Sequence, residues 1–399
     1  MKILFLTMQY PPVQNGGIGW YVGTLAPKLA TRGHDVHVLS CVSGQGRSDS
    51  ILQGVHVHRR GWRNIRGLWR FGKYSGLPIT IAHLQAGISA FLEAESLGVR
   101  FDVIEYPDWH AEAWVFACRR RTALVGHIHA AIPYIQKKHL QTFGSPRDVF
   151  CGGQLDRFAL NRAHLVTSPS KVALDGIKEI GWLRDRSVTI LPHGIDEEEW
   201  SGAPTAAKTL PVVLCVGRIE PVKAPEVLVK AMGIVRITIP DAEAVFVGAS
   251  NGEKDGRPYG EWVRQLAADV GGCRFVGNIE RKDLRQFYSA CRVVAVPSWF
   301  ETYGLAALEA MATRRPVIVT NTSGIAELLE KTGAGARIPP GDPVALADAL
   351  LPFLKSPEYA EVVGAQAFEA VVKYASLHMI TEKRENVYHR AIELSRAMA

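Results

Sequence analysis

Short apolar runs alternate with longer segments of helical periodicity along almost the whole chain, and this alternation constrains the fold more than any other feature. The apolar runs have the length of strands, and the segments between them are long enough for crossover helices. The runs expected to form strands are 2–8, 36–40, 55–59, 102–106, 124–129, 165–168 and 187–191, followed by 212–217, 244–247, 274–276, 293–296, 317–320 and 336–338. The pattern predicts an α/β protein with doubly wound parallel sheets.

The alternation is interrupted once, near the middle of the 399-residue chain. Pro192, an acidic run at 196–199 and a small-residue segment at 201–207 break it, and the last of these is typical of a linker. We therefore expect two Rossmann-like domains, 1–200 and 208–379, that face each other across a cleft. A last amphipathic helix at about 380–399 can pack back on the first domain, although the pattern alone does not place it.

The composition is that of an ordinary globular protein, with 47% hydrophobic residues, 21% charged residues and a net charge of +7. No apolar run has the length of a membrane span, and the apolar start of the chain is too short for a signal peptide. The six cysteines are scattered without zinc-like spacing, as expected of core thiols in a reducing compartment. These features predict a cytoplasmic protein.

Positive charge is concentrated in residues 59–73, which lie between Asp49 and Glu93 in a stretch without any acidic residue. Its six cations are Arg59, Arg60, Arg63, Arg66, Arg70 and Lys73. They supply +6 of the net +7, so the rest of the chain is nearly neutral and a general nucleic-acid-binding surface is not expected. The spacing of tryptophans and cations permits weak peripheral contact with the anionic inner face of a membrane. Because three glycines weaken such a helix, a solvated loop with packed tryptophans is the favoured interpretation.

A glycine-rich loop, Asn15-Gly16-Gly17, follows the first expected strand and leads into a helix. Glycine lets backbone amides approach a ligand closely, and a helix N-terminus favours an anion. The loop lacks the Gly-x-Gly-x-x-Gly spacing of dinucleotide-binding proteins, which argues against an NAD-dependent enzyme. A plain tight turn is the alternative interpretation.

Two cations, Arg218 and Lys223, follow the first strand of the second domain. A guanidinium and an ammonium at the end of a strand suit a pyrophosphate, above all one that gains charge as it leaves. Either side chain could instead be a solvated surface cation, which is the commoner fate of a lysine.

The strongest local motif carries two carboxylates, Glu301 and Glu309, on either side of a helix start expected near Tyr303. The first amides of this helix, at Tyr303, Gly304 and Leu305, would favour a phosphate together with the positive end of the helix dipole. One carboxylate could then bind a sugar hydroxyl and the other a ribose diol. In the alternative interpretation, Glu301 only favours the helix start and Glu309 is a solvated helix position.

These motifs, in this order, resemble the family 4 retaining glycosyltransferases, which have the GT-B fold. The resemblance spans nearly the whole chain. The motifs that carry it are Tyr10-Pro-Pro with its Gly-Gly loop, Arg32-Gly33-His34-Asp35-Val36, Leu191-Pro192-His193-Gly194-Ile195-Asp196, Gly217-Arg218 with Lys223, and Glu301-x7-Glu309. The family implies transfer of a sugar from a nucleotide-sugar donor with retention at the anomeric carbon.

The resemblance implies a role for each matching residue. The implied catalytic residues are Arg218, Lys223, Glu301 and His129, of which the first two stabilise the departing diphosphate and the last two contact the donor sugar. The other implied donor-binding residues are Gly16, Gly17, Ile279, Tyr303, Gly304, Leu305 and Glu309. Tyr10, Asn15 and Asp108 are placed on the acceptor side. Such enzymes use a front-face mechanism in which the leaving phosphate helps to deprotonate the acceptor, so His129 is expected to position the sugar rather than act as a base.

No cofactor and no metal are expected. His127 and His129 lie one residue apart, so on a strand they would share a face and could ligate a metal, but no third ligand has a recognisable spacing. No two aspartates are separated by a single residue, so the Asp-x-Asp metal site of the other main glycosyltransferase fold is missing.

The sequence departs from the family pattern at three positions: Ala224 and Arg314 stand where glycine is common, and His193 stands where asparagine is frequent. None of them is an implied phosphate or sugar contact. The expected reaction is transfer from a UDP- or GDP-hexose to a saccharide, lipid-linked or small-molecule acceptor. A nucleotide-sugar epimerase of similar fold and a non-catalytic nucleotide-sugar-binding subunit are the alternatives.

Overall fold

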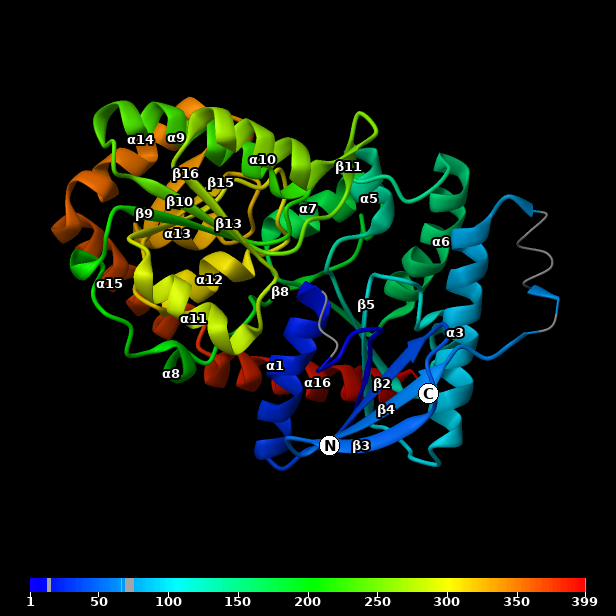
Figure 1. Ribbon diagram of the computed structural model, residues 1–399. Helices are drawn as coiled ribbons and strands as arrows, with labels where there is room; N and C mark the ends of the chain where they lie inside the picture. Colours follow the sequence, from blue (N-terminus) through cyan, green and yellow to red (C-terminus); the bar gives the residue numbers. More distant parts are fainter. Residues whose placement is uncertain (13–15, 66, 69–74, 139, 399) are drawn as a thin grey trace. The chain divides into compact units, whose positions relative to one another are not determined.

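The computed structural model describes residues 1–12, 16–65, 67–68, 75–138 and 140–398. The chain divides into two compact units (Figure 1). Unit 1 comprises Met1–Gly194 and Leu377–Ala399, and unit 2 comprises Ile195–Ser376. Each unit contains a mainly parallel sheet with helices on both faces, as expected from the alternation of strands and helices.

The sheet of unit 1 has the strand order β3-β4-β2-β1-β5-β6-β7-β8. Its strands are β1 (Lys2–Leu6), β2 (Asp35–Val42), β3 (Ser48–Leu52), β4 (Val55–Gly61), β5 (Val103–Pro107), β6 (Ala123–His127), β7 (Leu165–Ser168) and β8 (Thr189–Ile190). All neighbours are parallel except β3 and β4. Strand β3 was not among the expected strands, because this mostly exposed edge strand contains no apolar run.

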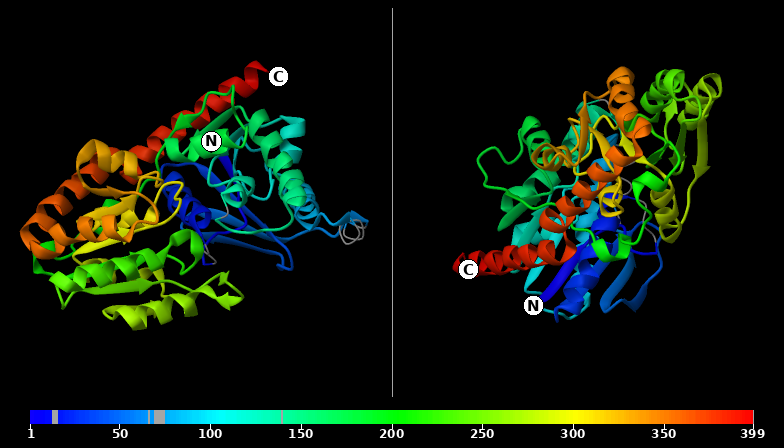
Figure 2. Two further views of the ribbon diagram at one scale, coloured as in Figure 1. Left: turned by 90° about the horizontal axis from the view of Figure 1, so that it is seen from above. Right: turned by 90° about the vertical axis from the view of Figure 1, so that its left-hand side faces the viewer.

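The helices of unit 1 are α1 (Gly17–Thr31), α3 (Pro78–Ser96), α4 (Trp114–Arg119), α5 (Ile132–Lys137), α6 (Pro146–Arg162), α7 (Lys171–Glu179) and α16 (Leu377–Ala397). Helices α3, α4 and α6 pack together on one face of the sheet, whereas α1 and α16 pack on the other (Figures 1 and 2). Arg32, which follows α1, binds Glu385 of α16 through two hydrogen bonds of 2.7 and 2.9 Å. The C-terminal helix is therefore part of unit 1.

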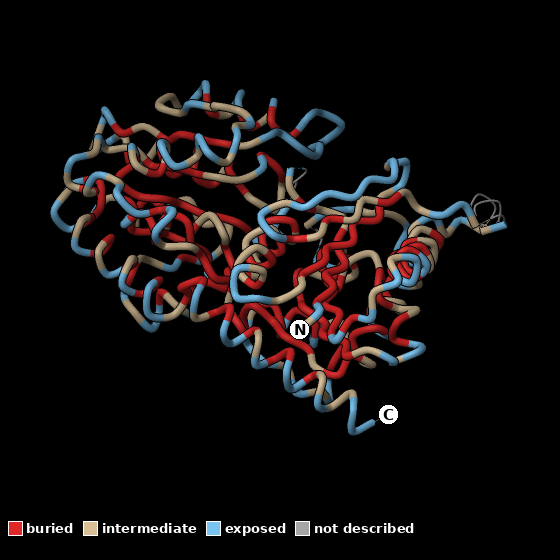
Figure 3. The backbone as a smooth tube through the Cα atoms, turned by 90° about the horizontal axis from the view of Figure 1, so that it is seen from below, coloured by how far each residue is buried: buried red, intermediate tan, exposed pale blue. Residues whose placement is uncertain are grey.

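The sheet of unit 2 is entirely parallel, with the order β13-β10-β9-β14-β15-β16. Its strands are β9 (Val212–Val216), β10 (Glu243–Val247), β13 (Cys273–Gly277), β14 (Val293–Val296), β15 (Val317–Thr320) and β16 (Gly335–Ile338), and a separate hairpin joins β11 (Glu253–Lys254) to β12 (Arg257–Pro258). The strands of both sheets are mostly buried (Figure 3).

The helices of unit 2 are α8 (Glu197–Trp200), α9 (Pro225–Thr238), α10 (Tyr259–Val270), α11 (Arg281–Ala290), α12 (Leu305–Ala312), α13 (Ala326–Thr332), α14 (Pro343–Lys355) and α15 (Pro357–Tyr374), with 3-10 turns η1 (Ala206–Lys208) and η2 (Pro221–Lys223). Helix α9 packs against both α10 and α14 (Figure 1). Residues 201–207 are not a free linker: Ala206 is buried in the core of unit 2, and Arg315 donates a 2.7 Å hydrogen bond to the carbonyl oxygen of Pro204.

The strand order reverses once in each sheet. In unit 1 the chain runs outward from β1 in one direction and from β5 in the other, and in unit 2 it does so from β9 and β14. Doubly wound sheets bind ligands at such a switch point, beyond the carboxyl ends of the strands. We therefore expect the ligand-binding residues of each unit in the loops that follow these four strands.

The described part of the basic segment is held by the protein itself. Arg60 is buried and lies 2.7 Å from Asp49 and 3.2 Å from Glu93, which Arg63 also contacts at 2.7 Å. The indole nitrogen of Trp62 donates to the carbonyl oxygen of Cys41 at 3.0 Å. Arg66, Arg70 and Lys73 lie outside the described residues. None of the helices described combines the length and the hydrophobicity that crossing a bilayer requires.

Candidate active site

Lys223 and Glu301 meet at the switch point of unit 2. Lys223 ends the turn η2 that follows β9, and Glu301 lies in the loop after β14. The Nζ atom of Lys223 is 2.7 Å from Oε1 of Glu301, and the hydroxyl of Ser298 donates to the same oxygen at 2.8 Å. The amide of Trp299 donates to the carbonyl oxygen of Val222 at 2.9 Å and thereby ties the two loops together. The sequence predicted both residues of this ion pair, but it did not indicate that Ser298 donates a hydrogen bond to Glu301.

The backbone around Glu301 is fixed by the loop that follows β15. The amide of Glu301 donates to the carbonyl oxygen of Thr322 at 3.2 Å, and the amide of Gly324 donates back to Glu301 at 3.0 Å. The hydroxyl of Thr320 bonds to the carbonyl oxygen of Ser298 at 2.8 Å. These bonds hold the carboxylate at a defined place before any ligand binds, which is the arrangement that electrostatic catalysis needs.

Helix α12 begins at Leu305, two residues later than expected from the sequence. Gly304 has φ of 110°, a conformation that side chains disfavour, and a Cβ there would lie 3.0 Å from the hydroxyl oxygen of Ser323. Tyr303 is buried and stands before the helix. Gly304 is the N-cap, and its carbonyl oxygen accepts from the amide of Leu308 at 3.0 Å, so the amides without a partner inside the helix are those of residues 304–307. Of the expected set, Gly304 and Leu305 belong to this group and Tyr303 does not.

Glu309 is only 5% exposed, so the interpretation of this residue as a solvated helix position is wrong. The Tyr288 hydroxyl donates to its Oε2 at 2.9 Å, and Nη1 of Arg281 lies 3.8 Å from its Oε1. Tyr288 and Arg281 belong to α11, and no motif in the sequence associates them with Glu309. A buried carboxylate with a hydroxyl partner is well placed to bind a further hydroxyl-bearing group.

Arg218 follows β9 and is oriented by a buried carboxylate. Its Nη2 lies 2.9 Å from Oε1 of Glu220, whose other oxygen accepts a 3.3 Å hydrogen bond from Asn251. The Arg218 side chain remains 47% exposed, so it is accessible to solvent. Ile279 lies in the loop after β13 and is half-buried.

The two positions where the family has glycine both adopt left-handed backbone. Ala224 has φ of 47° between η2 and α9, and Arg314 has φ of 57° after α12. Such a conformation costs a residue other than glycine roughly 1 kcal/mol. The guanidinium of Arg314 lies 4.2 Å from the centre of the Phe368 ring, a contact that offsets part of this cost.

In unit 1, Asp108 and His129 follow the neighbouring strands β5 and β6. Oδ1 of Asp108 accepts hydrogen bonds from the amides of His129 at 2.6 Å and Ala130 at 3.2 Å. Burial raises the pKa of Asp108 to about 7. Burial, and then the charge of Arg384, lower the pKa of His129 to about 3. The imidazole is therefore neutral at physiological pH and a weak base.

The structure brings a third imidazole, that of His193, to His127 and His129. Nε2 of His127 lies 3.2 Å from Nε2 of His193, and one nitrogen from each of the three rings lies within 4.8 Å of the others. No spacing in the sequence indicated this third partner. Burial is the largest cause that lowers the pKa of all three histidines, and the charge of the nearby Arg384 lowers each of them further. The same positive charge opposes a metal cation there.

The glycine-rich loop is partly described. Gly17 is the first residue of α1, and Gly16 before it has extended backbone with φ of −172°. Tyr10 is buried, and burial raises its pKa to about 12. Asn15 lies outside the described residues.

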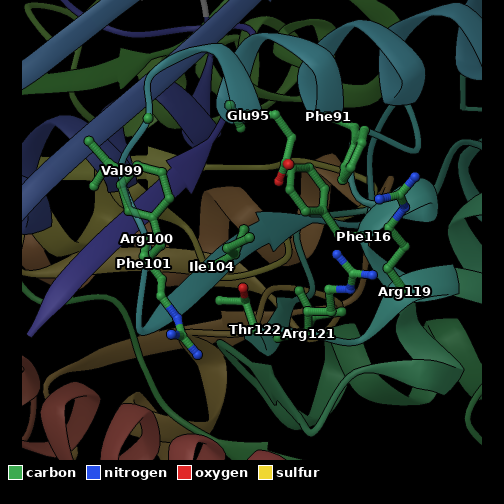
Figure 4. Close-up of a pocket in the computed structure, with 13 residues that line it drawn as sticks. Phe91, Glu95, Val99, Arg100, Phe101, Ile104, Phe116, Arg119, Arg121 and Thr122 are labelled. Atoms are coloured by element: carbon green, nitrogen blue, oxygen red, sulfur yellow. The ribbon is translucent and has the colours of Figure 1, made fainter.

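A cavity of about 480 Å³ lies elsewhere, at the amino end of β5 and β6 in unit 1 (Figure 4). Phe91, Phe101 and Phe116 line it together with Arg100 and Arg119, and the Arg119 guanidinium lies over the Phe91 ring. Because the candidate residues of unit 1 gather at the opposite, carboxyl end of these strands, this cavity does not mark their site.

Two sequence models match the chain in succession. Residues 15–199 match "Glycosyltransferase Family 4", and residues 196–370 match "Glycosyl transferases group 1". The chain belongs to the family 4 glycosyltransferases. It is accordingly a retaining glycosyltransferase that uses a nucleotide-sugar donor.

Individual relatives and solved structures are similar to this chain over most of its length. The glycogen synthase of Mycobacterium tuberculosis is 28% identical over 90% of this chain and 88% of its own length. The D-inositol 3-phosphate glycosyltransferase of Stackebrandtia nassauensis is 28% identical over 88% of this chain and 82% of its own. The sucrose-phosphate synthase structure from Thermosynechococcus elongatus has a TM-score of 0.78 at 22% identity, covering 98% of both chains. Anabaena HepE, solved with UDP and glucose, has a TM-score of 0.72 at 19% identity, covering 97% of this chain and 99% of its own. These structures show the GT-B fold.

Proposed function

We propose that unit 2 binds a UDP- or GDP-hexose and that Lys223 and Arg218 stabilise the diphosphate as it leaves. The contact between Lys223 and Glu301 carries this proposal, because it places a cation and a carboxylate together at the switch point of the sheet. A diphosphate gains negative charge when its bond to the anomeric carbon breaks, and preformed cations stabilise that charge without reorganisation. In this proposal Lys223 and Arg218 supply the positive charge that stabilises the leaving diphosphate, and no metal ion is required.

Glu301 and Glu309 bind the two ends of the donor in this proposal. Glu301 accepts hydrogen bonds from hydroxyls of the hexose, and Glu309 accepts from the ribose diol. The backbone amides around Tyr303, Gly304 and Leu305, at the start of α12, bind the β-phosphate of the donor. The backbone near Ile279 contacts the base of the nucleotide. Arg218 is partly exposed, so its guanidinium can donate to the phosphate while it keeps its contact with Glu220.

Unit 1 supplies groups for the sugar and the acceptor. His129 positions the donor sugar, Gly16 and Gly17 shape the same region, and Tyr10, Asn15 and Asp108 belong to the acceptor side. Because the pKa of His129 is about 3, the imidazole accepts a proton poorly at neutral pH. This favours the front-face mechanism, in which an oxygen of the leaving phosphate takes the proton of the acceptor hydroxyl on the face from which it departs.

The names of several relatives suggest which substrates to test first. HepE has been solved with UDP-glucose. A trehalose-phosphate synthase of the same fold from Burkholderia xenovorans is named as UDP-forming and was solved with glucose-6-phosphate. We therefore infer that UDP-glucose is the first donor to test, with small phosphorylated sugars and cyclitols as first acceptors, before saccharides and lipid-linked acceptors.

A two-step experiment tests the proposal. UDP-, GDP- and ADP-sugars are first compared for thermal stabilisation, which rises with ligand concentration over Kd. Release of nucleotide diphosphate from the stabilising donor is then measured with and without acceptors. If the protein transfers the sugar, release of the nucleoside diphosphate should be much faster when an acceptor is present. An epimerase would instead convert the donor sugar without acceptor, and a binding subunit would be stabilised but convert nothing.

A further inference from the structure

Strands β3, β4 and β2 are neighbours at one edge of the unit 1 sheet (Figure 1). Their sequences and register place histidines and aspartates in a row on one face. Asp35 and His37 are two residues apart on β2, and His56 and His58 are two apart on β4, so each pair projects from the same face of its strand. The parallel register sets His37 opposite His56. Asp49 of β3 stands opposite His58 in the antiparallel register.

Three close contacts link four of these side chains in a chain. Oδ1 of Asp49 lies 2.6 Å from Nδ1 of His58, Nε2 of His58 lies 2.9 Å from Nδ1 of His37, and Nε2 of His37 lies 2.9 Å from Oδ1 of Asp35. A fourth contact, of 3.7 Å, joins the same Asp35 oxygen to Nε2 of His56.

These contacts leave one position, between Nε2 of His37 and Oδ1 of Asp35, that a proton or a metal ion can occupy. Asp49 is ionised because Arg60 binds the same oxygen at 2.7 Å, so His58 carries its proton on Nδ1 and donates it to Asp49. One proton is shared between Nε2 of His58 and Nδ1 of His37, which lie 2.9 Å apart. Nε2 of His37 lies 2.9 Å from Oδ1 of Asp35, and one ligand atom from each of Asp35, His37 and His56 lies within 4.8 Å of the other two.

We propose that a divalent transition-metal ion of the Zn²⁺ type binds at this edge of the sheet, held by Asp35 Oδ1, His37 Nε2 and His56 Nε2. Two imidazoles and one carboxylate are a preferred ligand set for Zn²⁺. Ligand atoms 2.9 and 3.7 Å apart can share one ion at the usual bond length of about 2.0–2.2 Å. The contact of His37 with His58, and of His58 with Asp49, fixes the tautomer that presents Nε2 to the metal.

The site is open to solvent on one side. The side chains of His56 and Asp35 are 43% and 39% exposed, whereas that of His37 is 7% exposed. An ion can therefore enter from solvent and keep water as a further ligand. The rings of His37 and His56 are stacked, so His56 turns about its side-chain bonds as it binds. The ion would join β2 to β4 and so stabilise the sheet edge.

Zn²⁺ binding to the full chain, first treated with a chelator, tests this proposal by calorimetry and by the visible absorption of bound Co²⁺. We expect one tight ion, and at least a tenfold higher Kd in His56→Gln and in Asp35→Asn. Asp35→Asn is suited to the test because its amide can donate to His37 Nε2 and so leaves no repulsive contact. The matched control is His378→Gln, which removes an exposed histidine that contacts Glu382 at 3.2 Å but has no second imidazole beside it; its Kd should equal that of the wild type.

Two outcomes would overturn the proposal. Unchanged Zn²⁺ affinity in both His56→Gln and Asp35→Asn would show that the ion binds elsewhere. Failure of the folded wild type to bind Zn²⁺ or Co²⁺, with NMR showing His37 or His58 doubly protonated at neutral pH, would show that a proton occupies the position assigned to the metal.

Discussion

The guanidinium of Arg384, in the C-terminal helix α16, lies 3.3 Å from the carboxylate of Glu105, which precedes it by 279 residues on β5. Both side chains are buried. The hydroxyls of Tyr21 and Tyr388 each donate to this carboxylate at 2.6 Å, and Arg384 also donates to the hydroxyl of Thr167 at 2.9 Å. The network connects α1, β5, β7 and α16, and so makes the end of the chain an integral part of unit 1.

Replacing Arg384 by alanine should therefore destabilise unit 1 strongly. The change leaves the buried carboxylate of Glu105 without its cation, and loss of one partner of a buried pair typically costs about 3–5 kcal/mol. Urea unfolding followed by circular dichroism measures the effect. Arg390→Ala, an exposed position on the same helix, serves as the control and should change the stability by no more than about 0.5 kcal/mol. Equal urea midpoints for the two variants would contradict this role of Arg384.

Lys223→Ala should reduce turnover far more than stability. If Lys223 stabilises the departing diphosphate, its loss should lower kcat roughly 100-fold or more, as removal of one preorganised charge-stabilising group does in other enzymes. The partly exposed pair with Glu301 contributes at most about 1 kcal/mol to folding. Steady-state kinetics and thermal unfolding of the same preparations give both quantities.

Lys282→Ala is the matched control for Lys223. Lys282 also lies in unit 2 and contacts a glutamate, Glu280, at 2.6 Å, but its side chain is 74% exposed. Wild-type kcat is expected for this variant. A Lys223→Ala enzyme with unchanged kcat would exclude the assigned role.

Glu309→Gln should chiefly weaken nucleotide binding. The amide keeps the shape of the side chain and can still accept from Tyr288, so the fold should persist, while the loss of a charged hydrogen-bond acceptor raises the Kd for the nucleoside diphosphate about tenfold or more. Isothermal calorimetry measures the change. Glu330→Gln, which alters a 63% exposed glutamate paired with Arg337, should bind as the wild type does. Wild-type affinity in Glu309→Gln would remove this residue from the nucleotide site.

Asp108→Asn should alter the dependence of stability on pH. Because the folded-state pKa of Asp108 is raised from 3.8 to about 7, the folded protein keeps a proton that the unfolded chain has lost between these values. Its contribution is fully present below about pH 4 and is lost as the pH rises to about 7. The stability of the wild type relative to Asp108→Asn should therefore fall over this window, by at most about 1.4 kcal/mol per pH unit.

Urea midpoints of the two proteins, taken at several pH values, give this difference. The buried histidines lose stability on acidification in both proteins, so their contribution cancels in the comparison. Asp156 has a similarly raised pKa and its charge helps to raise that of Asp108, so the measured difference includes the coupling between these two carboxyls. A constant difference across the window would show that Asp108 does not titrate there.

Much of the architecture could be predicted from the sequence because it depends on local patterns. Buried parallel strands have to be continuously apolar, and β1, β9 and β14 are, so their positions and the loops after them follow from the order of residues. The order of strands around each switch point then brings Arg218, Lys223 and Glu301 to one edge. The edge strand β3 escaped prediction because an exposed strand has no need of apolar residues.

What only the tertiary structure decided are the contacts between side chains distant in sequence. Tyr288 beside Glu309, His193 beside His127, and Arg384 beside Glu105 have no shared spacing, because each pair comes from different elements whose packing sets their distance. The start of α12 depended similarly on Gly304, which has a positive φ and leaves little room for a side chain against Ser323 and Ile325. Sequence order thus determines which strands form and where their loops emerge. Burial against other elements determines the partner, and with it the charge state, of each group in those loops.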